Sequence, residues 1–467
     1  MPPAFQLQIE RINQKLSKLQ QADPELKVFG ARGHEYHRNP PMREDEVQAF
    51  ETKYGLTLPE CYRVFLLQVG DSSATIKDTI AGPYYGLYRL GVGTDDLVCE
   101  SPELYLKMPC LLSPAMSDAD WEHLTEPIQY NEEDEEFHPE SEQKHIINVE
   151  DDYLDNWGKV FSGLLPLGTQ GCTYYHALVL NGDFAGRVVN VNIDLQKPQF
   201  AYEANFLDWY ERYLDEVLSG QLLSKHSSWF GYQRGDSLEV LLSVYEKSSD
   251  RQQKQEALAG IIYKKPPLPA PYLDEIERLL TLFPEDSYQL LQILTLSDYE
   301  RAKPYLTKMA TIDLKPVVQF LHWYYPNKKS EWVSVVKEQL PQITDEETFR
   351  FATYTLTEQP TDFGECLLPF TSHPDPQFRI TAFYTLNQSI NMENYLPTFI
   401  KGLEDTNNDV LRTTLQATNN IHNEQLLPYY QKIAKRFPTE TDHILSNLEH
   451  CLKKYELTID QLLKMQF

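Results

Sequence analysis

The feature that most constrains the fold is a change of pattern near the middle of the 467-residue chain. From about residue 80 to residue 193, short apolar segments alternate with glycine-containing turns, a pattern typical of strands. After about residue 236 the strand signals disappear, and short apolar helices separated by turn residues follow one another. A single hydrophobic core rarely serves a chain of this length. The sequence therefore predicts an α+β domain over residues 1–222 and an all-α domain over residues 223–467.

Local signals place the elements of the first domain. Gly55 and Gly70 are helix-ending residues, Pro59 is a helix-opening residue, and Asn181-Gly182-Asp183 is a hairpin turn signal. Apolar residues at helical or alternating spacing predict the positions of the other helices and strands. We expect helices over residues 4–22, 43–54, 60–69 and 206–218, and strands over residues 164–167, 174–180 and 187–193. Together they predict a central mixed or antiparallel sheet with flanking helices.

The second domain contains a weak internal sequence repeat, whose two copies we call the echoes. Asp375-Pro376-Gln377-Phe378-Arg379 is followed about 33 residues later by Asn408-Asp409-Val410-Leu411-Arg412. Repeated helix pairs of this length are typical of stacked helical repeats, so the sequence favours an α-solenoid over an irregular bundle. The clearest expected helices cover residues 238–245, 272–282, 288–296, 316–325, 349–356, 378–386 and 410–418.

Acidic residues are concentrated in the first domain. The net charge is −27, and residues 1–222 carry 17 Lys and Arg against 37 Asp and Glu. Such a chain repels nucleic-acid phosphates and anionic membranes and attracts basic proteins. An acidic insertion covers about residues 117–160, which is either a solvated loop or a docking surface. The candidate partner-binding residues in it are Glu132, Glu133, Asp134, Glu135, Glu136, Glu150, Asp151 and Asp152.

Motifs for catalysis, metals and cofactors are missing from the sequence. His34-Glu35-Tyr36-His37 lacks the spacing that places two histidines on one helical face, and no phosphate-binding loop or GxSxG elbow occurs. Cys172 and His176, four residues apart on an expected strand, would lie about 13 Å apart, too far for proton transfer. We therefore expect no catalytic residue, no metal and no cofactor.

The remaining signals indicate a cytoplasmic protein. Six scattered cysteines without metal-ligand spacing are typical of reduced thiols. The chain shows neither a secretory signal nor an apolar run of membrane-spanning length.

Two aromatic groups are candidates for contact surfaces. Tyr84-Tyr85-x-x-Tyr88 is more typical of core or sheet surface than of a partner contact. Trp229-Phe230-x-Tyr232 lies near the expected domain boundary, where it is expected to pack the two domains together, with an anchor for a partner as the alternative.

A longer motif near the N-terminus gives the first family resemblance. It combines a helical face, a Leu-Pro turn and a second helical face, and we assign Phe50, Glu51, Leu58, Pro59, Tyr62, Phe65 and Leu66 to it. This pattern resembles the opening of the SMI1/KNR4 (SUKH) superfamily, and the resemblance extends over residues 40–218. Gly86 resembles a residue of the family's first strand. Glu51 is interpreted as structural, accepting hydrogen bonds from the turn at Leu58.

The second resemblance lies in the helical domain. Asp375-Pro376-x-Phe378-Arg379 is similar to the inner part of a HEAT repeat, in which the arginine binds carboxylates of the turns. Arg379 and Arg412 occupy this position in the two echoes.

The resemblances imply a function in binding. Many bacterial SUKH proteins resemble immunity proteins that neutralise contact-dependent or type VI secreted toxins, often nucleases, by occluding their active sites. Fungal members are scaffolds. The resemblance therefore implies an immunity protein in bacterial competition, with a basic protein toxin as partner and neither nucleic acid nor membrane as a direct partner. The alternative is a scaffold or regulatory adaptor unrelated to a toxin.

Overall fold

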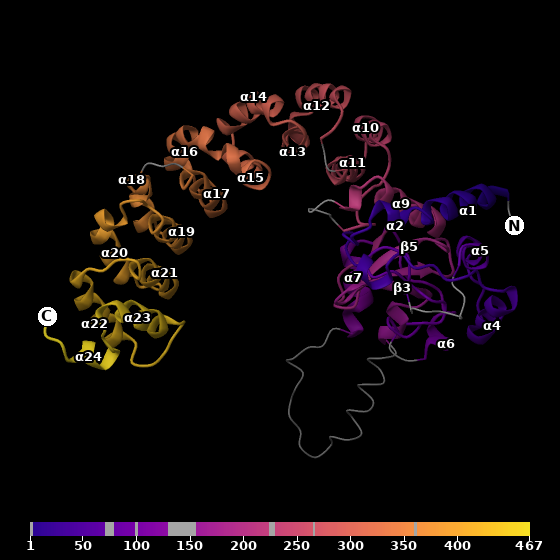
Figure 1. The fold of residues 1–467 in the computed structure, drawn as a ribbon, viewed down its shortest axis with the longest axis horizontal. Helices are drawn as coiled ribbons and strands as arrows, with labels where there is room; N and C mark the ends of the chain where they lie inside the picture. The colour runs from indigo at the N-terminus through magenta and orange to yellow at the C-terminus, as the bar shows by residue number, and fades with distance from the viewer. Residues whose placement is uncertain are drawn as a thin grey trace, which may run out of the picture. The chain divides into compact units, whose positions relative to one another are not determined.

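The chain forms two compact units, Met1–Lys265 and Pro266–Phe467. The computed structural model describes residues 3–70, 79–98, 101–128, 156–223, 229–264, 267–358 and 362–467. An N-terminal unit of helices and sheets precedes an all-helical region, which confirms the predicted fold class (Figure 1). The units divide further along the chain than residues 222/223, because helices α10 (Leu238–Lys247) and α11 (Arg251–Tyr263) belong to the first unit.

The helices of the first unit begin and end where local signals place them. Gly55 adopts φ 61° after α4, and the Asn205 side chain accepts hydrogen bonds from two amides at the start of α9. The expected helix over residues 4–22 is divided into α1 and α2. The helices up to α9 are α1 (Pro3–Leu16), α2 (Leu19–Ala22), α3 (Ala31–His34), α4 (Glu44–Tyr54), α5 (Glu60–Gln68), α6 (Pro102–Tyr105), α7 (Asp118–Thr125) and α9 (Phe206–Leu218).

Two antiparallel sheets lie in this unit. The larger has the strand order β3-β4-β5-β6, and the smaller pairs β1 with β2. The register aligns Leu164 with Val179 and Ala177 with Val189. The strands are β1 (Thr79–Ile80), β2 (Leu87–Tyr88), β3 (Leu164–Gly171), β4 (Tyr174–Val179), β5 (Val188–Asn192) and β6 (Gln199–Phe200). The expected strands thus form one antiparallel meander, with β6 as an additional short edge strand.

The larger sheet is buried on both faces. Leu165 and Val188 pack into a core with α1, α4, α5 and α9, whereas Leu164 and Val189 pack into a second core. This explains why every residue of β5 is buried, including Asn190 and Asn192.

Both ends of the predicted acidic insertion belong to the second core. Trp121 of α7 and Trp157 are 5% and 8% exposed, and their indole nitrogens donate hydrogen bonds to the carbonyls of Leu195 and Leu97. Residues 117–128 and 156–160 are therefore folded parts of the domain, which corrects the interpretation of residues 117–160 as one surface loop. Trp121 and Trp157, which are far apart in the sequence, hold these charged segments against the second core.

The second unit consists of two rows of packed helices. One row is α13, α15, α17, α19, α21 and α23, each packed on the next. Helices α12, α14, α16, α18, α20 and α22 pack against this row, and α24 packs against α22 (Figure 1). The longer helices are α12 (Ala270–Leu282), α13 (Ser287–Ser297), α14 (Tyr299–Ala310), α15 (Leu314–Tyr324), α16 (Val333–Gln339), α17 (Glu346–Leu356), α19 (Pro376–Leu386), α20 (Leu396–Leu403), α21 (Asn408–Thr418), α22 (Leu427–Arg436) and α23 (Ile444–Leu452). Two short helices complete it, α18 (Gly364–Leu367) and α24 (Ile459–Lys464). The helices expected in this region are present, and the HEAT-like solenoid stays a prediction.

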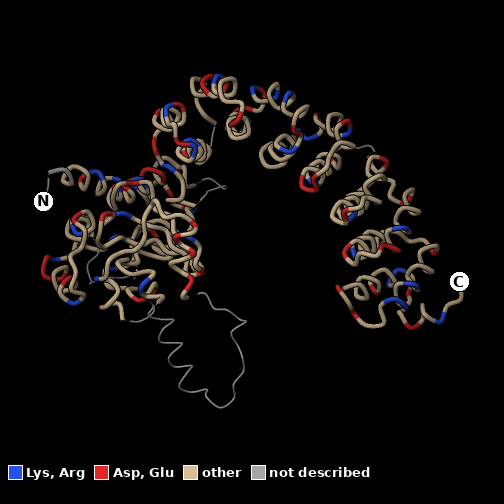
Figure 2. The backbone as a smooth tube through the Cα atoms, turned by 180° about the vertical axis from the view of Figure 1, so that it is seen from behind, with Lys and Arg blue, Asp and Glu red and all other residues tan. Residues whose placement is uncertain are grey.

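Basic and acidic residues are interspersed along the second unit (Figure 2). Arg301 of α14 pairs with Glu277 of α12, and Lys303 pairs with Glu331. The arginine of the HEAT-like motif, Arg379, binds Asp405. The first pair joins two helices, the second joins α14 to the 3-10 turn before α16, and the third joins α19 to the turn after α20.

Candidate functional site

The residues of the family motif build the core and its turns. Phe50, Tyr62, Phe65 and Leu66 are all buried in the first core. Glu51 Oε1 accepts a hydrogen bond of 2.9 Å from the Leu58 amide, directly before Pro59. These side chains therefore stabilise the core of the domain and the turn at Leu58.

Gly86 allows two backbone segments to approach closely. It has φ 96°, and a Cβ atom there would lie 2.4 Å from the Ile80 carbonyl oxygen. A larger residue would therefore disturb the paired strands β1 and β2.

The two arginines of the helical echoes differ in their surroundings. Arg379 forms a two-pronged pair with Asp405, at 2.8 and 3.0 Å, and donates to the carbonyl of His373. Arg412 pairs with Asp409 in its own helix at 2.7 Å and is more exposed. The first connects two elements, whereas the second lies mainly along one.

The predicted acidic binding residues lie outside the described residues. This applies to Glu132, Glu133, Asp134, Glu135, Glu136, Glu150, Asp151 and Asp152. Their role as a docking surface remains a prediction from the sequence.

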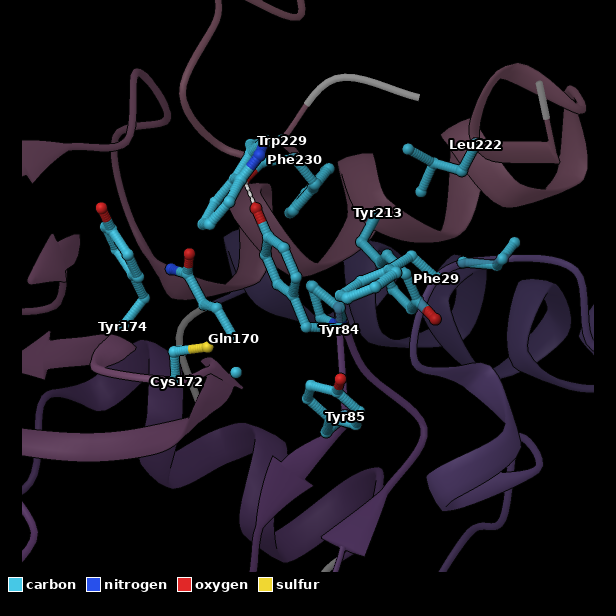
Figure 3. Close-up of a pocket in the computed structure, with 13 residues that line it drawn as sticks. Phe29, Tyr84, Tyr85, Gln170, Cys172, Tyr174, Tyr213, Leu222, Trp229 and Phe230 are labelled. Carbon is cyan, nitrogen blue, oxygen red and sulfur yellow. Dashed lines mark hydrogen bonds between the residues drawn. The ribbon is translucent and has the colours of Figure 1, made fainter. Parts of the chain in front are cut away.

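A cavity of about 560 Å³ in the first unit is the candidate site (Figure 3). It lies where the β3–β4 hairpin, the turn before β2, the α9 helix and the segment after residue 228 meet. Its volume is within the range of specific ligand pockets. The lining is mainly aromatic and consists of Val28, Phe29, Pro83, Tyr84, Tyr85, Gln170, Gly171, Cys172, Tyr174, Tyr213, Leu222, Trp229 and Phe230. We call this space the aromatic cavity.

Side-chain hydrogen bonds to successive carbonyls hold the segment that carries Trp229. The Tyr84 hydroxyl donates to the Phe230 carbonyl at 2.9 Å, and Gln199 Nε2 donates to the Tyr232 carbonyl at 2.7 Å. The Tyr232 hydroxyl in turn donates to Gln170 Oε1 at 3.0 Å. The sheet therefore fixes this segment at the edge of the cavity. The expected role of Trp229-Phe230-x-Tyr232 in packing two domains together stays a prediction.

Charged side chains fix the same segment from α9. Arg212 lies between Glu203 and Glu216, at 2.7 and 2.6 Å, and all three side chains are largely buried. Its guanidinium also lies 5.1 Å from the ring centre of Phe230. The Tyr263 hydroxyl of α11 donates to Glu216, so the network joins α9, α11 and the cavity segment.

A close backbone approach positions the other side of the cavity. Gly30 has φ 81°, and a Cβ atom there would lie 2.1 Å from the Tyr84 carbonyl oxygen. Only glycine permits this contact. It places Phe29 beside Tyr84 and Tyr85, with ring-centre distances of 6.1 and 5.6 Å.

Several rings of the cavity are open to solvent. Phe29 is 56% exposed, Trp229 48% and Tyr85 39%. Large aromatic side chains gain stability mainly from burial, and contiguous exposed ones mark interaction sites. The aromatic cavity therefore has the character of a contact surface for another molecule.

The polar side chains of the cavity bond mostly within the domain. Gln170 Nε2 donates to Asn190 Oδ1 at 2.7 Å, and the Tyr174 hydroxyl donates to Gln196 at 2.8 Å. The Tyr213 hydroxyl is buried and has no hydrogen-bond partner in the described part of the chain. Burial raises the pKa of Tyr213, so it stays neutral. Among the lining residues there is no Lys, Arg, Asp or Glu.

The histidine and cysteine candidates from the sequence are separated. Cys172 is exposed at the hairpin turn, whereas His176 is completely buried on β4, and burial lowers the pKa of His176 to about 3. His34 is also buried, and its Nδ1 accepts a hydrogen bond from the Tyr36 amide. Within the described ranges, no cluster of His, Cys, Asp and Glu suits a metal ion.

Sequence reasoning identified part of this cavity. It singled out Tyr84-Tyr85 and Trp229-Phe230 but favoured structural roles for them. Phe29, Gln170 and Tyr213 were missed, because they carry no motif and come from distant segments. The useful signal was the pairing of adjacent aromatic residues next to Gly or Pro.

The fold and the cavity define an α+β domain with an open aromatic site. Residues 41–212 match the SMI1 / KNR4 family (SUKH-1), so the N-terminal unit contains a domain of this family. This confirms the resemblance drawn from the motif. No curated protein and no solved structure matches the chain. No helix in the described residues has both the length and the apolar character to span a bilayer.

Proposed function

We propose that this protein is a cytoplasmic, non-catalytic immunity protein that binds a basic protein toxin, a nuclease in particular, and occludes its active site. The observation that carries the proposal is the aromatic cavity of a SUKH domain, with Phe29, Tyr85 and Trp229 half exposed around it. Aromatic side chains held rigidly at a surface are the usual anchors of protein interfaces. The family match supports a protein as the partner.

The acidic composition supports a basic partner. Residues 1–222 carry 20 more acidic than basic residues, which attracts a basic protein and speeds association. Replacing residues 132–136 with serine is expected to slow association at low salt and to change it little at high salt. An unchanged association rate at low salt would remove the acidic run from the mechanism.

Capture followed by a toxicity assay tests the function itself. The full-length chain is immobilised, and each stoichiometric partner from a lysate of the source cell is expressed alone in a bacterial host. We expect one basic partner that arrests growth, and rescue of growth when this chain is co-expressed. The double variant Tyr85→Ala/Trp229→Ala is expected to rescue less well than the matched variant Trp323→Ala, which changes an exposed tryptophan of the helical unit.

An adaptor remains the second candidate, supported by exposed aromatic side chains on the helical unit. Trp323 is 44% exposed and Tyr384 56% exposed, and they lie on α15 and α19 of the same helix row. Trp323 contacts Phe351 of α17, at 5.7 Å between ring centres. If every captured protein leaves growth unaffected and binding depends on Trp323 rather than on Trp229, the adaptor function replaces the immunity function.

A further inference from the structure

The rings of the aromatic cavity stand at steep angles to one another. Trp229 meets Tyr174 at 66° and Tyr84 at 58°, with ring centres 5.0 and 6.0 Å apart. Phe29 meets Tyr85 at 66°. Rings in such an arrangement form walls on several sides of one space, as Figure 3 shows, whereas parallel stacked rings would cover each other's faces.

The chemistry of these walls selects the group that can enter. An aromatic face carries partial negative charge, so it attracts a cation. An entering anion would find no basic side chain among the lining residues. An entering ammonium or guanidinium would meet no Lys or Arg among the lining residues, and Arg212, whose guanidinium lies 5.1 Å from the ring centre of Phe230, is paired with Glu203 and Glu216.

The charge of the domain favours the same group. The excess of acidic residues over residues 1–222 attracts positively charged surfaces. Between the two common cationic side chains, arginine suits the cavity better, because its planar guanidinium is weakly hydrated and stacks on aromatic faces.

We propose that the aromatic cavity receives the guanidinium of an arginine side chain presented by the basic partner, with Trp229, Tyr174 and Tyr84 as the surrounding walls. This inference rests on the proposed function and names the chemical group that the partner must supply. The Trp229 position depends on the hydrogen bonds to the carbonyls of residues 230–232, which make the wall rigid before the partner arrives.

Capped amino acids test this inference without the partner. N-acetyl-arginine amide is compared with N-acetyl-citrulline amide, which has nearly the same shape without the charge, by ligand-observed saturation-transfer NMR on the full-length chain. Protection of the exposed Cys172 thiol from alkylation, followed by mass spectrometry of its peptide, reports binding at the cavity itself.

We expect saturable binding of the arginine probe, roughly three- to thirtyfold tighter than that of the citrulline probe. Trp229→Ala should abolish the difference, Trp229→Phe should keep part of it, and the control Trp323→Ala should keep all of it. Equal binding of the two probes, or tighter binding of N-acetyl-phenylalanine amide, would overturn the inference in favour of an apolar anchor. Because the probes need no toxin, failure here leaves the growth-rescue test of the proposed function unaffected.

Discussion

His176 makes the stability of the first unit dependent on pH. Its side chain is completely buried between Tyr84 and Trp209, and neither ring nitrogen has a hydrogen-bond partner in the described part of the chain. Burial lowers the pKa of His176 from the ordinary 6.5 to about 3. The folded protein therefore keeps this ring neutral at a pH where the unfolded chain protonates it.

The sign and size of the effect follow from proton linkage. The unfolded state binds a proton on this residue below pH 6.5 and the folded state does not, so the free energy of unfolding falls as the pH drops from 6.5 towards 3. Between pH 8 and pH 5 the loss attributable to His176 is about 2 kcal/mol. This value depends little on the folded pKa, as long as that pKa lies well below 5.

The variant His176→Leu removes the titrating group. Urea unfolding of the full-length chain, followed by tryptophan fluorescence at pH 8 and pH 5, measures the difference. Four of the six tryptophans lie in the first unit, so the signal reports mainly on it. We expect the wild type to lose about 2 kcal/mol more than the variant between the two pH values. The exposed His123, replaced by glutamine, is the control and should behave as the wild type.

Equal pH dependence in wild type and His176→Leu would refute the reasoning. It would mean that the imidazolium is accommodated in the folded state, by solvent entry or by a rearrangement near Tyr84.

Three further predictions concern buried or paired charges. Arg212→Met removes the cation that pairs with two buried carboxylates and should destabilise the first unit by about 3–5 kcal/mol, whereas the exposed Arg43→Met should leave the unfolding curve nearly unchanged in the same urea assay. Burial by itself would raise the pKa of Glu211, but hydrogen bonds from basic side chains outweigh it and lower this pKa to about 2. The stability that Glu211 contributes is thus present above pH 4.5 and lost as the pH falls towards 2, so acid titration of Glu211→Gln should show a shallower loss in that window, and identical curves would contradict this. In the second unit Arg379→Ala should lower the thermal midpoint more than Arg412→Ala, since only the first breaks a largely buried two-pronged pair; equal shifts would show that the pair contributes little.

Elements with local signals were predictable from the sequence. Helices α4 and α5 follow from the glycine at 55 and the proline at 59, because these residues act on the backbone beside them. The family motif was recognisable for the same reason, since its residues are adjacent in the chain. The strands β3 to β5 were found by their apolar runs.

Such reasoning named Tyr84-Tyr85 and Trp229-Phe230 but did not predict that they line one cavity. Its walls come from segments near residues 29, 84, 172, 213 and 229, and no local pattern records that they meet. The contact of Gly30 with the Tyr84 carbonyl depends on tertiary packing, and so does the chain of hydrogen bonds to carbonyls 230–232. In the acidic insertion, the many acidic residues predicted a surface loop, whereas Trp121 and Trp157, which are far apart in the sequence, belong to the second core.

The network around Arg212 determines where the chain can be cut and joined to another domain. The family match ends at residue 212, yet the carboxylate of Glu216 and the hydroxyl of Tyr263 complete the surroundings of this arginine. A gene fusion that joined the family segment to a new C-terminal partner at residue 212 would separate the arginine from these groups. The segment that can be moved to another protein without breaking this network therefore extends through α11. Helices α10 and α11, which the sequence assigns to the repeat region, have to be kept together with the SUKH domain.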